Sequence, residues 1–123
     1  MTLVTLVTGT RAATRETALA ATLDDAVSTA LILEGMPDGS SRLDGLSKRD
    51  TLHIARIAPG CLCCVGNLTL RVTLNRILRH PPVRLYISLA NSTHLEQIRS
   101  FLSAPPYDAL LTLTDVMRCD DAT

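Results

Sequence analysis

The sequence is poor in aromatic side chains, and its charges balance. Aromatic residues make up only 2% of the 123 residues, and Trp is absent. The core must therefore be aliphatic, and the aromatic platforms on which nucleic-acid bases stack are nearly missing. Because twelve basic residues balance twelve acidic ones, bulk charge does not favour binding to nucleic acid or to an anionic membrane. We expect neither as a partner.

Long apolar runs and a signal peptide are also missing. The apolar stretches are short and interrupted by Thr or by charged residues, so no membrane span is expected. The first four residues, Met-Thr-Leu-Val, lack the basic region of a secretory signal. Both features favour a cytoplasmic protein, in which disulfide bonds are rare.

Lysine is nearly absent, since eleven of the twelve basic residues are Arg and Lys48 is the only Lys. Any function that requires a lysine must use this residue. It lies in a segment, about 35–50, that contains Gly, Ser, Pro and scattered charge without periodicity. Such a composition predicts a flexible loop.

Apolar periodicity predicts alternating strands and helices in a single domain over residues 1–123. Strands are expected at 2–8, 27–33, 51–58, 83–89 and 109–114, and helices at 12–23, at 67–79 and from 93 to the Pro-Pro pair at 105–106. Because helices separate most of the strands, the prediction is a three-layer α/β fold. Its sheet is mainly parallel, with about five strands and helices on both faces.

The first predicted strand ends at Gly9 and leads into a helix, as in phosphate-binding loops of the form G-x-x-x-x-G-K-[ST]. Here Thr14 takes the position of the second glycine, Arg15 that of the lysine, and Glu16 that of the Mg²⁺-binding hydroxyl. A β-branched side chain obstructs the close approach of phosphate to backbone. A forked guanidinium does not replace a lysine at a tight site, and a carboxylate repels a triphosphate.

A second absence points the same way. No Asp or Glu occurs from Thr51 to Leu95, although a Mg²⁺-dependent triphosphatase usually takes a carboxylate from a strand end in the middle of the fold. In the predicted strand at 83–89, the corresponding position carries Ser88 in place of a carboxylate. The sequence also has no N-K-x-D element to recognise guanine. GTP is therefore not expected as a cofactor, nor GTP hydrolysis as an activity. The helix that follows Gly9 could still attract an anion.

Three of the four cysteines, Cys61, Cys63 and Cys64, lie within four residues after a predicted strand and a Pro-Gly turn. Thiolates are soft ligands that favour Zn²⁺ or Cu(I), and this grouping suggests metal or redox chemistry. Redox chemistry is the weaker hypothesis because no C-x-x-C is present. The competing interpretation is that these are ordinary buried cysteines. A tetrahedral zinc site also needs a fourth ligand, and the candidates are Cys119, His53, His80, His94, water or a residue of a second subunit.

The central region carries a local excess of positive charge. It comes from five arginines, Arg56, Arg71, Arg76, Arg79 and Arg84. Three of them lie on one predicted helix, which indicates a solvent-exposed face, with an anionic or protein partner as the alternative.

Together these features resemble the CobW-like P-loop GTPases, relatives of the HypB and UreG metallochaperones. Residues 7–9 (Val-Thr-Gly) and 17–19 (Thr-Ala-Leu) are similar to the two ends of the family's phosphate loop. Residues 60–64 (Gly-Cys-Leu-Cys-Cys) are similar to its C-x-C-C element. The resemblance covers only about the first half of a family G domain, so it implies a truncated P-loop domain.

The resemblance implies roles for two groups of residues. Gly9, Arg15 and Thr17 would form a vestigial phosphate loop, and Cys61, Cys63 and Cys64 would bind a transition metal, commonly zinc. The resulting hypothesis is a CobW-like protein without GTPase competence that binds zinc or another transition metal. It would have an accessory role beside a protein partner in metal homeostasis. The alternative is a metal-free pseudo-GTPase that acts as a protein-interaction module. A truncated sheet exposes an edge, so a homodimer fits both hypotheses.

Overall fold

The computed structural model describes residues 2–9, 11–24, 26–35, 51–57, 68–89 and 95–119. The strands are β1 (Thr2–Thr8), β2 (Thr29–Glu34), β3 (Leu52–Ile57), β4 (Arg84–Leu89), β5 (Leu111–Leu113) and β6 (Met117–Arg118). The helices are α1 (Ala12–Thr22), α2 (Leu68–Ile77), α3 (Leu95–Leu102) and the short 3₁₀ helix η2 (Tyr107–Ala109). The predicted loop at about 35–50 lies almost entirely outside the described residues, as do Lys48, His94 and the three clustered cysteines.

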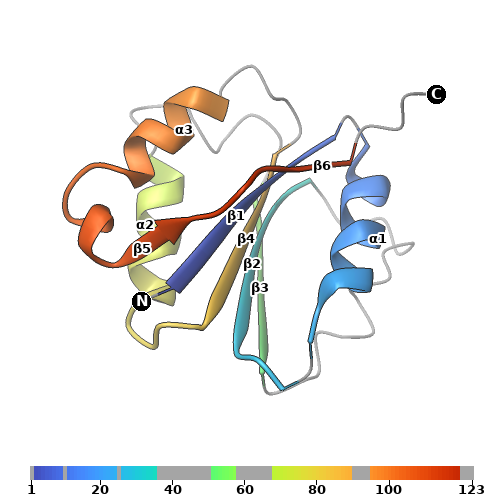
Figure 1. Cartoon of the computed structure of the whole chain (residues 1–123), viewed down its shortest axis with the longest axis horizontal. Coiled ribbons are helices and arrows are strands. Elements are labelled where there is room, and N and C mark those ends of the chain that lie inside the picture. The colour runs from blue at the N-terminus through green and yellow to red at the C-terminus, as the bar shows by residue number, and fades with distance from the viewer. Residues whose placement is uncertain are drawn as a thin grey trace.

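The strands form one parallel sheet in the order β3-β2-β4-β1-β5, and β6 also pairs with β1. Helix α1 covers one face of the sheet, and α2 and α3 cover the other (Figure 1). This arrangement confirms the predicted α/β fold with a parallel sheet. All six residues of β2 are buried, as expected for a strand covered on both faces.

Alternate residues of the strands build two separate cores. Ala30 and Ile32 of β2 pack beneath α2 and α3, whereas Leu31 and Leu33 pack beneath α1. This division follows from the two-residue period of a strand. Helix α2 contributes a buried stripe of Leu70, Leu74 and Ile77.

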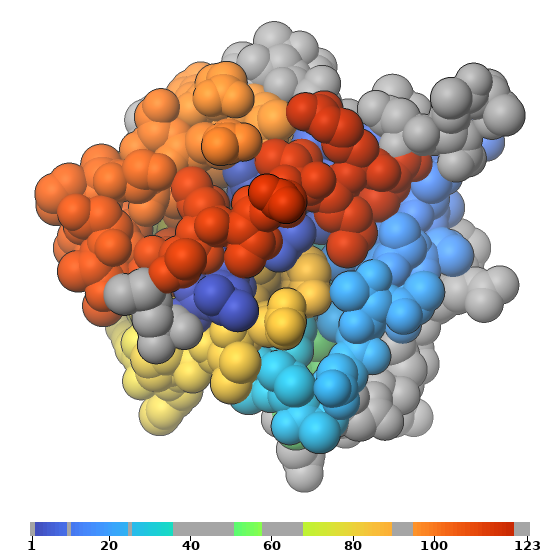
Figure 2. All heavy atoms as spheres, viewed as in Figure 1, coloured from blue at the N-terminus to red at the C-terminus, as the bar shows by residue number. Residues whose placement is uncertain are grey.

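The last predicted strand ends at residue 114, but the structure adds a further strand, β6, after it. Met117 and Arg118 pair with Val7 and Thr8 of β1, and the Cys119 backbone N–H donates to the Thr8 carbonyl over 2.7 Å. Backbone pairing does not require apolar side chains, so hydrophobic periodicity does not reveal this strand. Figure 2 shows the resulting C-terminal segment, in red, lying against the N-terminal strand.

No helix in the described ranges is long and apolar enough to span a membrane.

Candidate functional site

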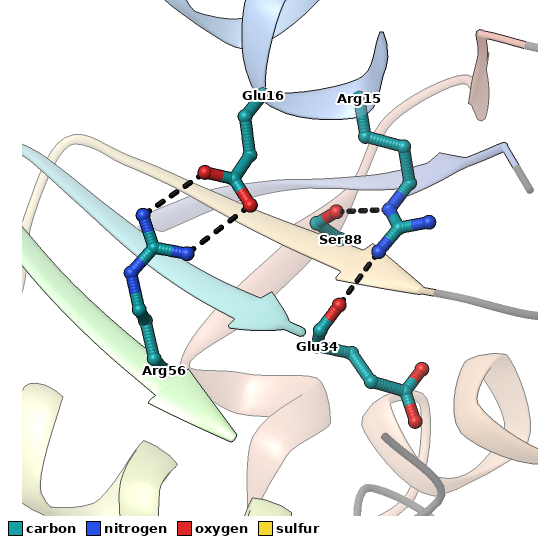
Figure 3. A network of polar contacts seen from close by, with 5 residues as sticks. All are labelled: Arg15, Glu16, Glu34, Arg56 and Ser88. Carbon is teal, nitrogen blue, oxygen red and sulfur yellow. Dashed lines mark hydrogen bonds and ion pairs between the residues drawn. The ribbon is translucent and has the colours of Figure 1, made fainter. Parts of the chain in front are cut away.

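Open parallel sheets bind ligands at the carboxyl ends of their strands. At this edge, β1 is followed by Gly9, β2 ends at Glu34, and β4 ends just after Ser88. Helix α1 follows β1 and extends the side chain of Arg15 into the same edge (Figure 3). The position expected to hold a phosphate-binding lysine therefore faces the ends of three strands.

The Arg15 side chain is 1% exposed, and its guanidinium is bound on three sides. Nε donates to Ser88 Oγ over 2.6 Å, Nη1 to the Gly9 carbonyl over 2.5 Å, and Nη2 to the Glu34 carbonyl over 2.6 Å. We call these four residues the Arg15 cluster. Its hydrogen bonds connect the carboxyl ends of β1, β2 and β4 through one side chain.

The positive charge of Arg15 is held mainly by neutral acceptors. Burial lowers the pKa of the guanidinium, and the nearby Glu34, Glu16 and Cys119 act in the opposite direction. The carboxylate of Glu34 points away from the guanidinium in Figure 3, and its main-chain oxygen is the acceptor. Because arginine stays protonated in proteins, the cluster holds a buried cation on carbonyl and hydroxyl oxygens.

Glu16, the next residue of α1, is engaged in a separate ion pair with Arg56 of β3 (Figure 3). The two Glu16 oxygens accept from Arg56 Nη2 and Nη1 over 2.9 and 3.1 Å. The Glu16 side chain is 4% exposed and that of Arg56 is 16% exposed. Arg56 is therefore only partly exposed to solvent, because a carboxylate from α1 binds it, whereas the three arginines of the predicted helix, Arg71, Arg76 and Arg79, are exposed as expected.

Gly9 allows two side chains to pack against the end of β1. A methyl group added at Gly9 would lie 3.0 Å from Arg15 Cγ and 3.3 Å from Cys119 Cβ. A close approach of side chains thus accounts for this glycine without a bound phosphate. Thr17, in contrast, is exposed on α1 and takes no part in the Arg15 cluster.

The described ligand candidates lie at two opposite edges of the sheet. Cys119 is half-buried next to Gly9 at the carboxyl edge, whereas His53 and His80 line a cavity at the amino ends of the strands. Cys61, Cys63 and Cys64 lie outside the described residues. Within the described ranges, no three His, Cys, Asp or Glu side chains gather as a metal site.

The internal role of Arg15 could not be deduced from sequence. Two of its three acceptors are main-chain carbonyls, which every residue possesses. Its third partner, Ser88, is 73 positions away in the sequence. The only sequence signal for this contact was that Ser88 lies near the end of a predicted strand.

Comparison with known proteins gives one relative. The chain is 36% identical over 77 residues to a protein of Escherichia coli (strain K12) described as "Zinc chaperone YeiR". The aligned part covers 61% of this chain and 24% of the relative, so the chain spans about a quarter of the relative's length. No protein-family model matches the chain, and no solved structure does so significantly. The chain therefore shares a distant, partial similarity with a zinc chaperone of the CobW family, which confirms the resemblance that its motifs predicted.

Proposed function

We propose that this protein binds zinc, or another transition metal, through Cys61, Cys63 and Cys64, and that it neither binds nor hydrolyses GTP. In this proposal it is an accessory protein that hands metal to, or receives it from, a protein partner in metal homeostasis. The partial similarity to a zinc chaperone supports the choice of zinc. The chemistry of three closely spaced thiolates supports it independently.

The topology favours the carboxyl edge of the sheet for this metal site. The segment with the three cysteines leaves β3 after Ile57 and enters α2 at Leu68, and both of these residues belong to the carboxyl edge. Cys119 lies at the same edge, about 19 Å away across four strand spacings. Cys63 and Cys64 follow Ile57 by six and seven residues, so a nearly extended chain spans about 20–23 Å from Ile57 to these thiols, which is the separation that a site shared with Cys119 requires.

The same topology makes His53 and His80 poor candidates for the fourth ligand. Both line the amino edge of the sheet, and the six residues of β3 separate the two edges by about 20 Å. Cys119, His94, a water molecule or a residue from a second copy of the chain would therefore complete a tetrahedral site.

The Arg15 cluster is the main observation that supports the proposed loss of GTP binding. A phosphate loop needs a lysine that points at the phosphates and a hydroxyl that holds Mg²⁺. Here Arg15 directs its N–H groups to Gly9, Ser88 and Glu34 of its own chain. The hydroxyl position carries Glu16, whose oxygens bind Arg56. Nucleotide binding would have to break these contacts and bring a triphosphate next to a carboxylate.

Zinc titration against a chromophoric chelator tests the metal site. Wild-type protein should bind one equivalent of zinc, and the double variant Cys63→Ser, Cys64→Ser should lose competitive binding. Cys119→Ser serves as the matched single-thiol comparison, and weaker binding in this variant would identify the fourth ligand. Equal zinc affinity in wild type and the double variant would remove the proposal. A stable dimer that contains no metal by elemental analysis would support the protein-interaction module instead.

A fluorescent GTP analogue tests the second half of the proposal. We expect no saturable Mg²⁺-dependent binding to wild-type protein. Saturable binding that EDTA abolishes would show that the Arg15 cluster opens to admit a nucleotide, contrary to the account above.

A further inference from the structure

A cavity of about 360 Å³ lies at the amino ends of β2 and β3, at the edge of the sheet opposite the Arg15 cluster. The first residues of the two strands, the end of α2 and the turn that leads into β4 surround it. Its volume lies within the range of small-molecule sites, about 300–1,000 Å³.

The local packing explains why the cavity exists. Ala30 of β2 and His53 of β3 are register partners, so their side chains point to the same face of the sheet. Ala30 belongs to the core beneath α2, which places His53 on the α2 side as well. The small Ala30 side chain leaves space below, and α2 ends at Ile77 before it can cover this corner.

Three basic side chains from three different segments line this cavity: His53 of β3, Arg76 of α2 and His80 of the following turn. All three residues are exposed. In the described part of the chain, none of these side chains makes a hydrogen bond or an ion pair. Arg15 and Arg56 differ in this respect, because their donors are already bound by the chain's own oxygens.

The remaining lining fits the same class of ligand. The exposed Ser28 offers a further hydroxyl donor at the rim, and none of the described lining residues is acidic. Ile77 and Pro82 add an apolar wall, against which a non-polar group can pack. A guanidinium presents a planar fork that matches two oxygens of a phosphate or carboxylate.

We propose that this cavity binds the phosphate group of a small phosphate monoester. Arg76 donates to two of the phosphate oxygens, and His53 and His80 donate to the others. The organic part of the ester packs on Ile77 and Pro82. The site lies at the opposite edge of the sheet from the proposed metal site and does not depend on it.

Titration of ¹⁵N-labelled full-length protein with inorganic phosphate and with phenyl phosphate, at constant ionic strength, tests this site. Both probes should shift the backbone amides of His53, Arg76 and His80 saturably, and the ester should bind more tightly. Arg76→Gln should weaken binding by about tenfold or more, as expected when a hydrogen bond to a charged group is lost. The matched control is Arg79→Gln, which removes the same charge from an exposed residue that does not line the cavity. The control should change affinity less than twofold.

Three results would overturn the proposal. One is the absence of saturable shifts with either probe, and another is equal weakening by Arg76→Gln and Arg79→Gln, which indicates general charge attraction. The third is a response of His53 and His80 to Zn²⁺ but not to phosphate. Repeating the titration with the Cys63→Ser, Cys64→Ser variant separates this site from the metal proposal, and phosphate affinity should be unchanged there.

Discussion

Replacement of Arg15 by Met tests whether the Arg15 cluster holds the carboxyl ends of three strands together. Met keeps a long unbranched side chain that can fill the space, but it removes all guanidinium donors. The carbonyls of Gly9 and Glu34 then lose a donor at a buried position.

The expected loss of stability follows from these contacts. A hydrogen bond to a charged group contributes about 1.5–3 kcal/mol, and Arg15 makes three of them with one side chain. The contributions of the three hydrogen bonds are not additive. The Met variant also no longer has to bury a charge, which offsets part of the loss of stability. Each buried carbonyl that loses its donor costs about 1–3 kcal/mol, and after this offset we expect a decrease in unfolding free energy of about 2–4 kcal/mol.

Urea unfolding followed by circular dichroism at 25 °C measures the effect. Arg11→Met is the matched control, because Arg11 is exposed and its side chain makes no capping hydrogen bond. The control should change the unfolding free energy by less than about 0.5 kcal/mol. The unfolding free energy of Arg15→Lys should lie between those of wild type and Arg15→Met. The lysine ammonium keeps the charge, but it lacks the planar fork of N–H groups that reaches three acceptors. An Arg15→Met protein within about 1 kcal/mol of wild type would refute the reasoning, since charged hydrogen bonds of ordinary strength would then be absent.

Three further perturbations follow from the same structure. Gly9→Ala should lower the unfolding free energy by about 1–3 kcal/mol, because the new methyl group would lie 3.3 Å from Cys119 Cβ; an unchanged urea midpoint would contradict this. Arg56→Met removes the bidentate partner of Glu16 and should cost about 1–3 kcal/mol, and adding Glu16→Gln should recover part of that loss in a double-mutant cycle. Burial raises the pKa of Tyr107 above 10.0, so this group's contribution to stability is complete below the unfolded-state pKa and is lost as the pH rises above it. Urea midpoints at pH 9 and pH 11 should therefore fall further in wild type than in Tyr107→Phe, and parallel pH profiles would count against this.

The strands and helices were predictable where side-chain burial shapes the sequence. β2 and β4 lie inside the sheet, and each carries an uninterrupted run of apolar or aromatic residues at its centre, Ala30–Leu33 and Leu85–Ile87. The spacing of Leu70, Leu74 and Ile77 likewise identified α2. β6 escaped prediction because it is held by main-chain hydrogen bonds at the edge of β1, where side chains are not fully buried.

The candidate site was predictable in position but not in chemistry. The alignment with a phosphate loop identified Arg15 and Glu16 as the substituted positions, and their charge and shape led to the prediction that they do not bind a nucleotide. Their new partners lie on other strands, 73 residues away for Ser88 and 40 for Arg56. No local sequence pattern encodes pairs so far apart. The sequence therefore indicated only that Arg15 and Glu16 replace phosphate-loop residues, and not that both form hydrogen bonds within the protein.

The position of β1 within the sheet has a consequence for biosynthesis. In the described part of the chain, its pairing partners are β4, β5 and β6, and the nearest of these begins at Arg84. At about 5–20 residues per second, a ribosome needs about 4–16 s to add the eighty or so residues that separate Leu3 from Arg84. During that interval the apolar segment Thr2–Thr8 has no strand to pair with. A chaperone that recognises short aliphatic stretches has this interval in which to bind the segment.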